Sequence, residues 1–189
     1  MKKVFSFVLT VTMLMSLFSI PASAITIPKQ EADNAYQAQS FTVVTDGYVE
    51  NYYINENREV FVNGKNITTI TQKSNLSLGI FSAREDWQYA GEFTYDYDLT
   101  GLTVAGAVKL LGKLGLKTTV SALKAYGGGY ISNSVFQQGV GVNDVQATYY
   151  KNINKPRPDM KIEHSFYFYV EVFGERPVEE YLGGFTTYS

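Results

Sequence analysis

The chain has 189 residues, with 16 lysines and arginines, 18 aspartates and glutamates and a net charge of −2 at pH 7. This mildly acidic balance offers no footprint for nucleic acid, which is therefore not an expected partner. Cysteine is absent and histidine occurs once, which excludes disulfide bonds, a lipid-modified cysteine and a zinc site of the usual His/Cys composition. No cofactor is expected.

Residues 1–24 have the pattern of a cleavable signal peptide. Two lysines precede an apolar run, and the Ala-Ser-Ala sequence at 22–24 places small residues before the expected cleavage point. An uncleaved membrane anchor is the alternative, but the apolar run is short and ends at Pro21. We therefore expect a secreted, extracellular protein in which residues 25–39 form a flexible lead-in and residues 40–189 form one domain.

The first part of this domain reads as β-structure. In "SFTVVTDGYVENYYI" (40–54), two strand-like runs flank Asp46-Gly47, and in "EVFVNGKNITTIT" (59–71) two more flank Asn63-Gly64. Asn-Gly readily supplies the positive φ angles of a type I′ turn, so a hairpin is expected there. Residues 76–83, "LSLGIFSA", are a further short strand candidate.

Residues 87–98, "WQYAGEFTYDYD", alternate with a period of two, as expected for an antiparallel strand that is half buried. Alternation sends the aromatic residues to one face of the sheet and the acidic residues to the other. The aromatic face is either part of the core or a binding platform for sugar or a membrane interface. Its candidate contact residues are Trp87, Tyr89, Tyr95 and Tyr97.

The acidic face of this strand carries Glu92, Asp96 and Asp98. Such a face is typically solvated and keeps a strand from associating with another. Asp96 and Asp98 lie about 7 Å apart along a strand, a separation that also suits an inverting glycoside hydrolase or a calcium site. No metal site is predicted, and these two aspartates are the weak candidates for one.

Residues 101–129 interrupt the β pattern with a helical stretch that contains no acidic residue. Drawn as one continuous helix, its lysines form a narrow stripe, but the apolar residues on either side of Gly112 and Gly115 face nearly opposite directions. We therefore predict a break and two helices, at about 100–113 and 117–126, packed on one face of a sheet. Asp98 or Thr100 is expected to cap the first helix and Gly127 to end the second.

The exposed lysines leave a second hypothesis open. The segment docks in the soluble form and inserts at a membrane surface or binds an envelope partner later, through Lys109, Lys113, Lys117 and Lys124. A simple transmembrane span is excluded because each lysine costs roughly 2.5–3.5 kcal/mol near the bilayer centre. Burial of Val104, Val108 and Leu111 on the sheet would favour the docked form.

Two more strands complete the domain. "VNDVQATYYKNI" (142–153) and "KIEHSFYFYVEVF" (161–173) are separated by the turn "NKPRPDM", and "YLGGFTTYS" (181–189) is a possible edge strand. In 161–173, His164 lies on the apolar face, where a hydrogen-bonded structural histidine is expected. No nucleophile-elbow motif accompanies it, so a non-enzymatic protein is predicted, with a carboxylate-based hydrolase as the weaker alternative.

The order of "VNGK", an aromatic strand ending in "YDYD", a Gly/Ala/Leu-rich helical insert, "ATYYK" and "FYFYVEV" resembles small exported proteins of Gram-positive bacteria. Large unmodified bacteriocins of a geobacillin-like type are among these. The resemblance implies killing or self-protection at the envelope of a neighbouring cell.

The expected fold is α+β, a mainly antiparallel sheet with the two-helix insert on one face. The expected function is action at membrane or cell-envelope surfaces, and the alternative is a carbohydrate- or protein-binding module that uses the aromatic sheet face. The oligomeric state does not follow from these patterns.

Overall fold

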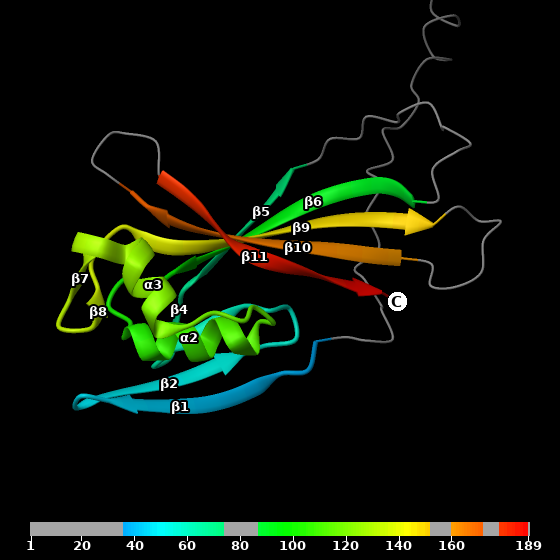
Figure 1. The fold of residues 1–189 in the computed structure, drawn as a ribbon. Coiled ribbons are helices and arrows are strands. Elements are labelled where there is room, and N and C mark those ends of the chain that lie inside the picture. Colours follow the sequence, from blue (N-terminus) through cyan, green and yellow to red (C-terminus); the bar gives the residue numbers. More distant parts are fainter. Residues whose placement is uncertain (1–35, 74–86, 152–159, 172–177, 189) are drawn as a thin grey trace, which may run out of the picture. The chain divides into compact units, whose positions relative to one another are not determined.

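The computed structural model describes residues 36–73, 87–151, 160–171 and 178–188, and the following account concerns these residues (Figure 1). The predicted signal peptide, most of the lead-in, the strand candidate at 76–83 and the turn at 154–159 lie outside them. The described residues have the predicted α+β fold: mostly antiparallel strands with two helices inserted between them.

A four-stranded antiparallel sheet forms first, with the strand order β1-β2-β3-β4. Asp46-Gly47 and Asn63-Gly64, which connect β1 to β2 and β3 to β4, all have positive φ angles. The hairpin predicted at Asn63-Gly64 is therefore confirmed, and the break at Asp46-Gly47 is a second hairpin turn. The strands are β1 (Gln39–Thr45), β2 (Tyr48–Ile54), β3 (Val60–Val62) and β4 (Lys65–Asn66).

The larger, five-stranded sheet has the order β11-β10-β9-β6-β5 and is also antiparallel. Its last strand in the chain lies at an edge, as predicted. The strands are β5 (Thr68–Lys73), β6 (Trp87–Asp98), β9 (Val140–Lys151), β10 (Met160–Val170) and β11 (Val178–Tyr188).

The insert between β6 and β9 contains helices α2 (Val104–Lys113) and α3 (Val120–Gly127). The predicted break is confirmed, with Gly115 at a φ of 104° between the helices. The predicted caps were wrong. The side chain of Thr103 accepts a hydrogen bond from the Gly106 N–H and caps α2, whereas Asp98 instead holds the N–H of Thr100 in a turn.

Helix α3 is capped by Thr119 and stays helical through Gly127, so the prediction that Gly127 ends it in a left-handed conformation was wrong; the C-cap is Gly128, with φ 46° and ψ −123°. A single 3₁₀ turn and a short hairpin follow, and neither was predicted. They are η1 (Gly128–Tyr130), β7 (Ile131–Ser132) and β8 (Val135–Phe136).

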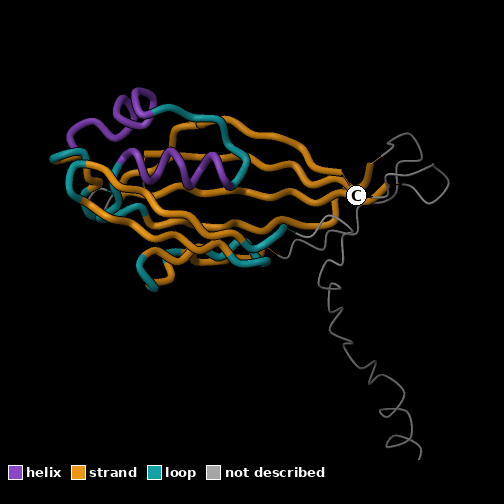
Figure 2. The backbone as a smooth tube through the Cα atoms, turned by 90° about the horizontal axis from the view of Figure 1, so that it is seen from below, coloured by secondary structure: helices purple, strands orange, loops and turns teal. Residues whose placement is uncertain are grey.

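The core lies between the helices and the inner faces of both sheets (Figures 1 and 2). Val104 and Leu111 of α2 are fully buried and Val108 is partly buried, and Leu123 of α3 is fully buried. The apolar faces of the helices are thus used in packing. On the large sheet the apolar side of β10 faces the same core, with Phe166 and Phe168 fully buried, because alternate residues of a strand point to opposite faces.

Candidate functional site

The predicted aromatic platform does not lie on one face of the sheet. The register of β6 against β9 shifts between Tyr89 and Gly91, where Ala90 is an extra residue. A β-bulge of this kind reverses the face of every residue beyond it. Tyr95 and Tyr97 therefore point to the core, whereas Trp87 and Tyr89 lie on the outer face. The prediction that these four rings share a face was wrong, because the alternation was counted through the bulge.

The inward pair belongs to the core. Tyr97 is fully buried, its hydroxyl donates to the backbone oxygen of Arg58 at 3.4 Å, and its ring stacks with Tyr95 at 6.5 Å between centroids. Burial raises the pKa of both tyrosines, so they are neutral at any physiological pH. The ring of Tyr97 is therefore not available to a ligand, and that of Tyr95 is partly buried against the core.

The outward pair joins a separate cluster at the other end of β6. Tyr89 meets Tyr149 edge to face at 5.7 Å and Trp87 lies 6.1 Å from Tyr188. The ammonium of Lys161 stands 4.3 Å from the ring centre of Tyr149 and 5.5 Å from that of Trp87, and it pairs with Glu163 at 2.6 Å. The rings of Tyr149 and Trp87 already hold a cation of the protein itself.

The acidic residues of β6 lie on the outer face, where each has a partner. Glu92 pairs with Lys73 at 3.1 Å, and Asp96 accepts a hydrogen bond of 2.7 Å from the hydroxyl of Tyr169. Burial raises the pKa of Asp96, and the hydrogen bond from Tyr169 opposes this in part. Among the described residues, no group of three or more acidic or histidine side chains is placed to hold a metal ion.

The four lysines of the insert are exposed but do not lie on one helix. Lys109 donates to the backbone oxygen of Thr42 at 3.1 Å and lies 5.3 Å from the ring centre of Phe41. Lys109 and Lys113 belong to α2, whereas Lys117 precedes α3 and Lys124 is in it, beyond the break at Gly115. The continuous lysine stripe therefore does not exist in this fold.

A buried polar network around Asp144 was not predicted. This carboxylate is fully buried and accepts hydrogen bonds from Arg58 at 3.0 Å and from Gln146 at 2.9 Å. His164 lies 3.2 Å away and stacks on Phe185 at 4.3 Å. Because an ionised carboxylate only accepts hydrogen bonds, Nδ1 of His164 carries a proton. His164 is thus hydrogen-bonded in the core, as expected, but its partner lies on another strand and had no signal in the sequence.

Glu50 forms a second buried polar contact that was missed. Its carboxylate accepts the N–H of Thr103 at 2.6 Å, the hydroxyl of Thr103 at 2.7 Å and the hydroxyl of Tyr52 at 3.1 Å. This places a negative charge at the N-terminus of α2, where the helix dipole stabilises it. The contact ties β2 to α2, and we assign it a structural role.

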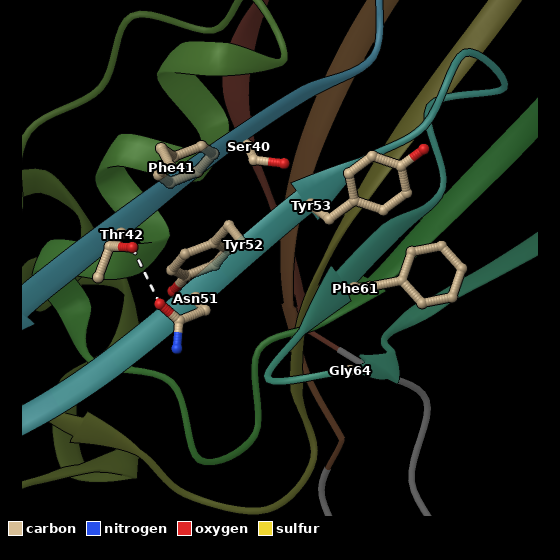
Figure 3. A pocket seen from close by; sticks show the side chains of 8 residues that line it. All are labelled: Ser40, Phe41, Thr42, Asn51, Tyr52, Tyr53, Phe61 and Gly64. Carbon is tan, nitrogen blue, oxygen red and sulfur yellow. Dashed lines mark hydrogen bonds between the residues drawn. The ribbon is translucent and has the colours of Figure 1, made fainter.

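The outer face of the four-stranded sheet carries an open groove of about 530 Å³ (Figure 3). The rings of Tyr53 and Phe61 lie side by side at 5.9 Å, and Thr42 donates a hydrogen bond of 2.9 Å to the Asn51 side chain. None of the described residues that line the groove is charged. Its lining residues are Ser40, Phe41, Thr42, Asn51, Tyr52, Tyr53, Phe61 and Gly64.

This lining combines two kinds of group. Ser40, Thr42, Asn51 and Tyr53 are exposed, and they offer hydroxyl and amide groups beside aromatic rings. Phe41 and Tyr52 alternate with them along the strands, and their rings stack at 4.7 Å on the core side. The stacked pair beneath the sheet supports the strands that form the floor of the groove.

No protein family, curated protein or solved structure matches this chain. None of the described helices is both long enough and apolar enough to cross a membrane. The site therefore has to be interpreted from its own geometry.

Proposed function

We propose that the chain is a secreted, non-enzymatic protein that acts at the cell envelope by binding carbohydrate in the groove on the outer face of β1, β2 and β3. The observation that carries this proposal is the composition of the groove, in which the adjacent rings of Tyr53 and Phe61 lie beside uncharged hydroxyl and amide groups. The resemblance to exported bacteriocins makes the envelope of a neighbouring cell the expected place of action.

The chemistry of the groove matches that of a neutral sugar. A pyranose ring has apolar C–H faces that pack on aromatic rings, and hydroxyl groups at its rim that both donate and accept hydrogen bonds. Tyr53 is 45% exposed, so its ring is accessible to such a face. Thr42 and Asn51 hydrogen-bond to each other, which orients the amide for a ligand hydroxyl. The absence of a charge in the lining favours a neutral glycan over an anionic one.

The test is binding of the purified protein to insoluble polysaccharides (cellulose, chitin and isolated bacterial cell walls), followed by titration with soluble oligosaccharides of the type retained. Tyr53→Ala and Phe61→Ala are expected to weaken binding about 2- to 10-fold each, from the value of an aromatic contact. Tyr48→Ala is the matched control, because Tyr48 is also a tyrosine of β2 with 45% exposure but does not line the groove.

Retention that survives both substitutions, or that Tyr48→Ala weakens equally, would disprove the assignment to the groove. Trp87→Ala separates the two aromatic surfaces. A loss of binding on this change would move the carbohydrate site to the outer face of the large sheet. Unaltered circular dichroism spectra are required of every variant.

A membrane surface is the second candidate, and the exposure of Lys113, Lys117 and Lys124 favours it. Docking through these lysines would be mainly electrostatic, because most of the large apolar residues of the two helices are used in the core, although Val120 and Tyr126 of α3 are each 39% exposed. Flotation with anionic vesicles at low ionic strength tests this, since attraction between exposed charges is strongest there. Binding that Lys113→Glu, Lys117→Glu and Lys124→Glu together abolish would support it, and no flotation at low salt would exclude it.

A further inference from the structure

The strand β1 lies at an edge of the four-stranded sheet, and pairing among the described residues leaves one row of its peptide groups open. The N–H of Asn51 donates to the Asn63 side chain and its carbonyl accepts from the N–H of Asn63, so both groups of Asn51 point toward β3. Thr42, which lies opposite Asn51 in the register, therefore cannot pair with it. The peptide groups of Thr42, and by the same alternation those of Ser40 and Val44, point away from β2.

This edge has few of the features that usually protect an edge strand. Natural sheets block such edges with proline, bulges or charged residues along the strand. The sequence of β1, Gln-Ser-Phe-Thr-Val-Val-Thr, contains none of the charged residues or prolines, and its register with β2 is regular over its full length. Val44 is 71% exposed and its cross-strand neighbour Val49 is 55% exposed. Backbone and side chains alike are suited to receive another strand.

The charge beside this edge comes from α2 and is positive. The ammonium of Lys109 reaches the outward carbonyl of Thr42 at 3.1 Å. Lys113 lies one turn further along the helix, and its backbone oxygen accepts a hydrogen bond of 3.1 Å from Tyr36, three residues before β1. Both lysine side chains are exposed. The open edge is therefore bordered by two cations on the side of the sheet that faces α2.

We propose that the free edge of β1 binds an extended acidic segment of a partner protein as an additional β-strand. Main-chain hydrogen bonds to Ser40, Thr42 and Val44 supply affinity, and carboxylates on the side of the incoming strand that faces α2 pair with Lys109 and Lys113. When the partner's N–H takes the Thr42 carbonyl, Lys109 is released to meet a carboxylate. A second copy of the same edge would bring four lysines together, so charge favours the acidic segment over self-association.

The probe is a labelled, capped heptapeptide, Thr-Glu-Val-Glu-Val-Glu-Thr, which alternates acidic and apolar side chains at the strand period. The control peptide has the same sequence with lysine in place of each glutamate. Fluorescence anisotropy with the full protein is expected to show at least ten-fold tighter binding of the glutamate peptide at about 50 mM salt. This preference should shrink at about 500 mM salt, where the Debye length falls to roughly a few ångströms.

Two kinds of variant locate the site. The double change Lys109→Glu with Lys113→Glu is expected to reverse the preference, so that the lysine peptide binds more tightly. Lys124→Glu, the same charge change on α3, is the control and should leave the ratio unaltered. Thr42→Pro removes an outward N–H but no hydrogen bond to β2, and it should weaken both peptides while the fold persists.

Equal binding of the two peptides, no saturable binding up to millimolar concentration, or an effect of Lys124→Glu equal to that of the double change would overturn the proposal. Sedimentation velocity provides the remaining outcome. A concentration-dependent dimer of the unmodified protein that Thr42→Pro abolishes would assign the edge to a second copy and contradict the acidic partner. Carbohydrate retention is tested with Tyr53→Ala and Phe61→Ala, which change neither β1 nor the lysines of α2, so it is measured separately from peptide binding.

Discussion

Helix α2 contains two glycines for which replacement by alanine is expected to change stability in opposite directions. Gly112 is exposed, has an ordinary helical φ and has open space where a Cβ would lie. Gly112→Ala should therefore raise the free energy of unfolding by about 0.5–1 kcal/mol, the intrinsic advantage of alanine in a helix. Gly106 lies six residues earlier and faces β2.

At Gly106 an added Cβ would overlap the Glu50 carboxylate oxygen and the Tyr52 hydroxyl and lie 3.0 Å from Cδ of Glu50. Overpacking of this kind costs roughly 1–3 kcal/mol. Moving the carboxylate also weakens its bonds of 2.6 and 2.7 Å from Thr103, and hydrogen bonds to a charged group contribute about 1.5–3 kcal/mol each. Because part of this is offset by helix propensity, Gly106→Ala should lower the free energy of unfolding by about 2–4 kcal/mol.

Urea unfolding followed by circular dichroism measures both changes against the unmodified protein. A protein of this size loses about 2–4 °C in Tm per kcal/mol, so thermal unfolding provides a second measure. In a Glu50→Ala background, Gly106→Ala should cost less, since one of the two colliding groups is gone. The reasoning is refuted if Gly106→Ala is neutral, if both alanines shift stability in the same direction, or if the Glu50 background leaves the cost unchanged.

Three further predictions concern the buried and half-buried polar groups. Arg58→Ala removes the cation that pairs with the buried Asp144 and should lower the free energy of unfolding by about 3–5 kcal/mol, as measured by urea titration. A change under 1 kcal/mol would show that the ion pair contributes little. The folded-state pKa of Asp96 is raised above its unfolded value, so the folded state favours the protonated carboxyl. The stability that the protonated carboxyl contributes is fully present below the unfolded pKa and is lost as pH rises through the folded pKa. Asp96→Asn should accordingly stabilise the protein at pH 7 and lose this advantage in acid, and thermal unfolding between pH 3 and 7 that shows a constant difference would contradict the cause assigned. Gly141→Ala places a methyl group against the ring of Tyr169, which crosses Gly141 to reach Asp96, and it should cost roughly 1–3 kcal/mol by thermal unfolding; no loss would mean that the ring moves freely.

The elements that depend on local chemistry were predictable from the sequence. Asp46-Gly47 and Asn63-Gly64 form hairpins because their preference for positive φ needs no help from the rest of the chain. The break in the helical insert followed from two apolar faces that disagree across Gly112 and Gly115. The burial side of β10 followed from plain alternation. Each of these signals is contained within about a dozen residues.

The aromatic strand shows where such counting fails. An extra residue at Ala90 shifts the register of β6 against β9. This shift is visible only when β6 is paired with its neighbouring strand, and the composition of β6 does not indicate it. Gly91 was the only local hint, since an isolated glycine within a strand often marks a bulge. The consequence for the site is large, because Trp87 and Tyr89 are separated from Tyr95 and Tyr97 by the thickness of the sheet.

The sequence by itself determined the fold class, the turns at Asp46-Gly47 and Asn63-Gly64, the helix break and the lack of cysteine chemistry, because these depend on local backbone preference and composition. Only the tertiary structure decided which polar groups meet. Arg58, Asp144 and His164 come from a loop and two strands far apart in the chain, and Glu50 reaches Thr103 across 53 residues. The same holds for the groove beside Tyr53 and for the open edge of β1 next to Lys109. Both depend on how strands pair and where a helix packs, and such long-range contacts leave no periodic signal in one sequence.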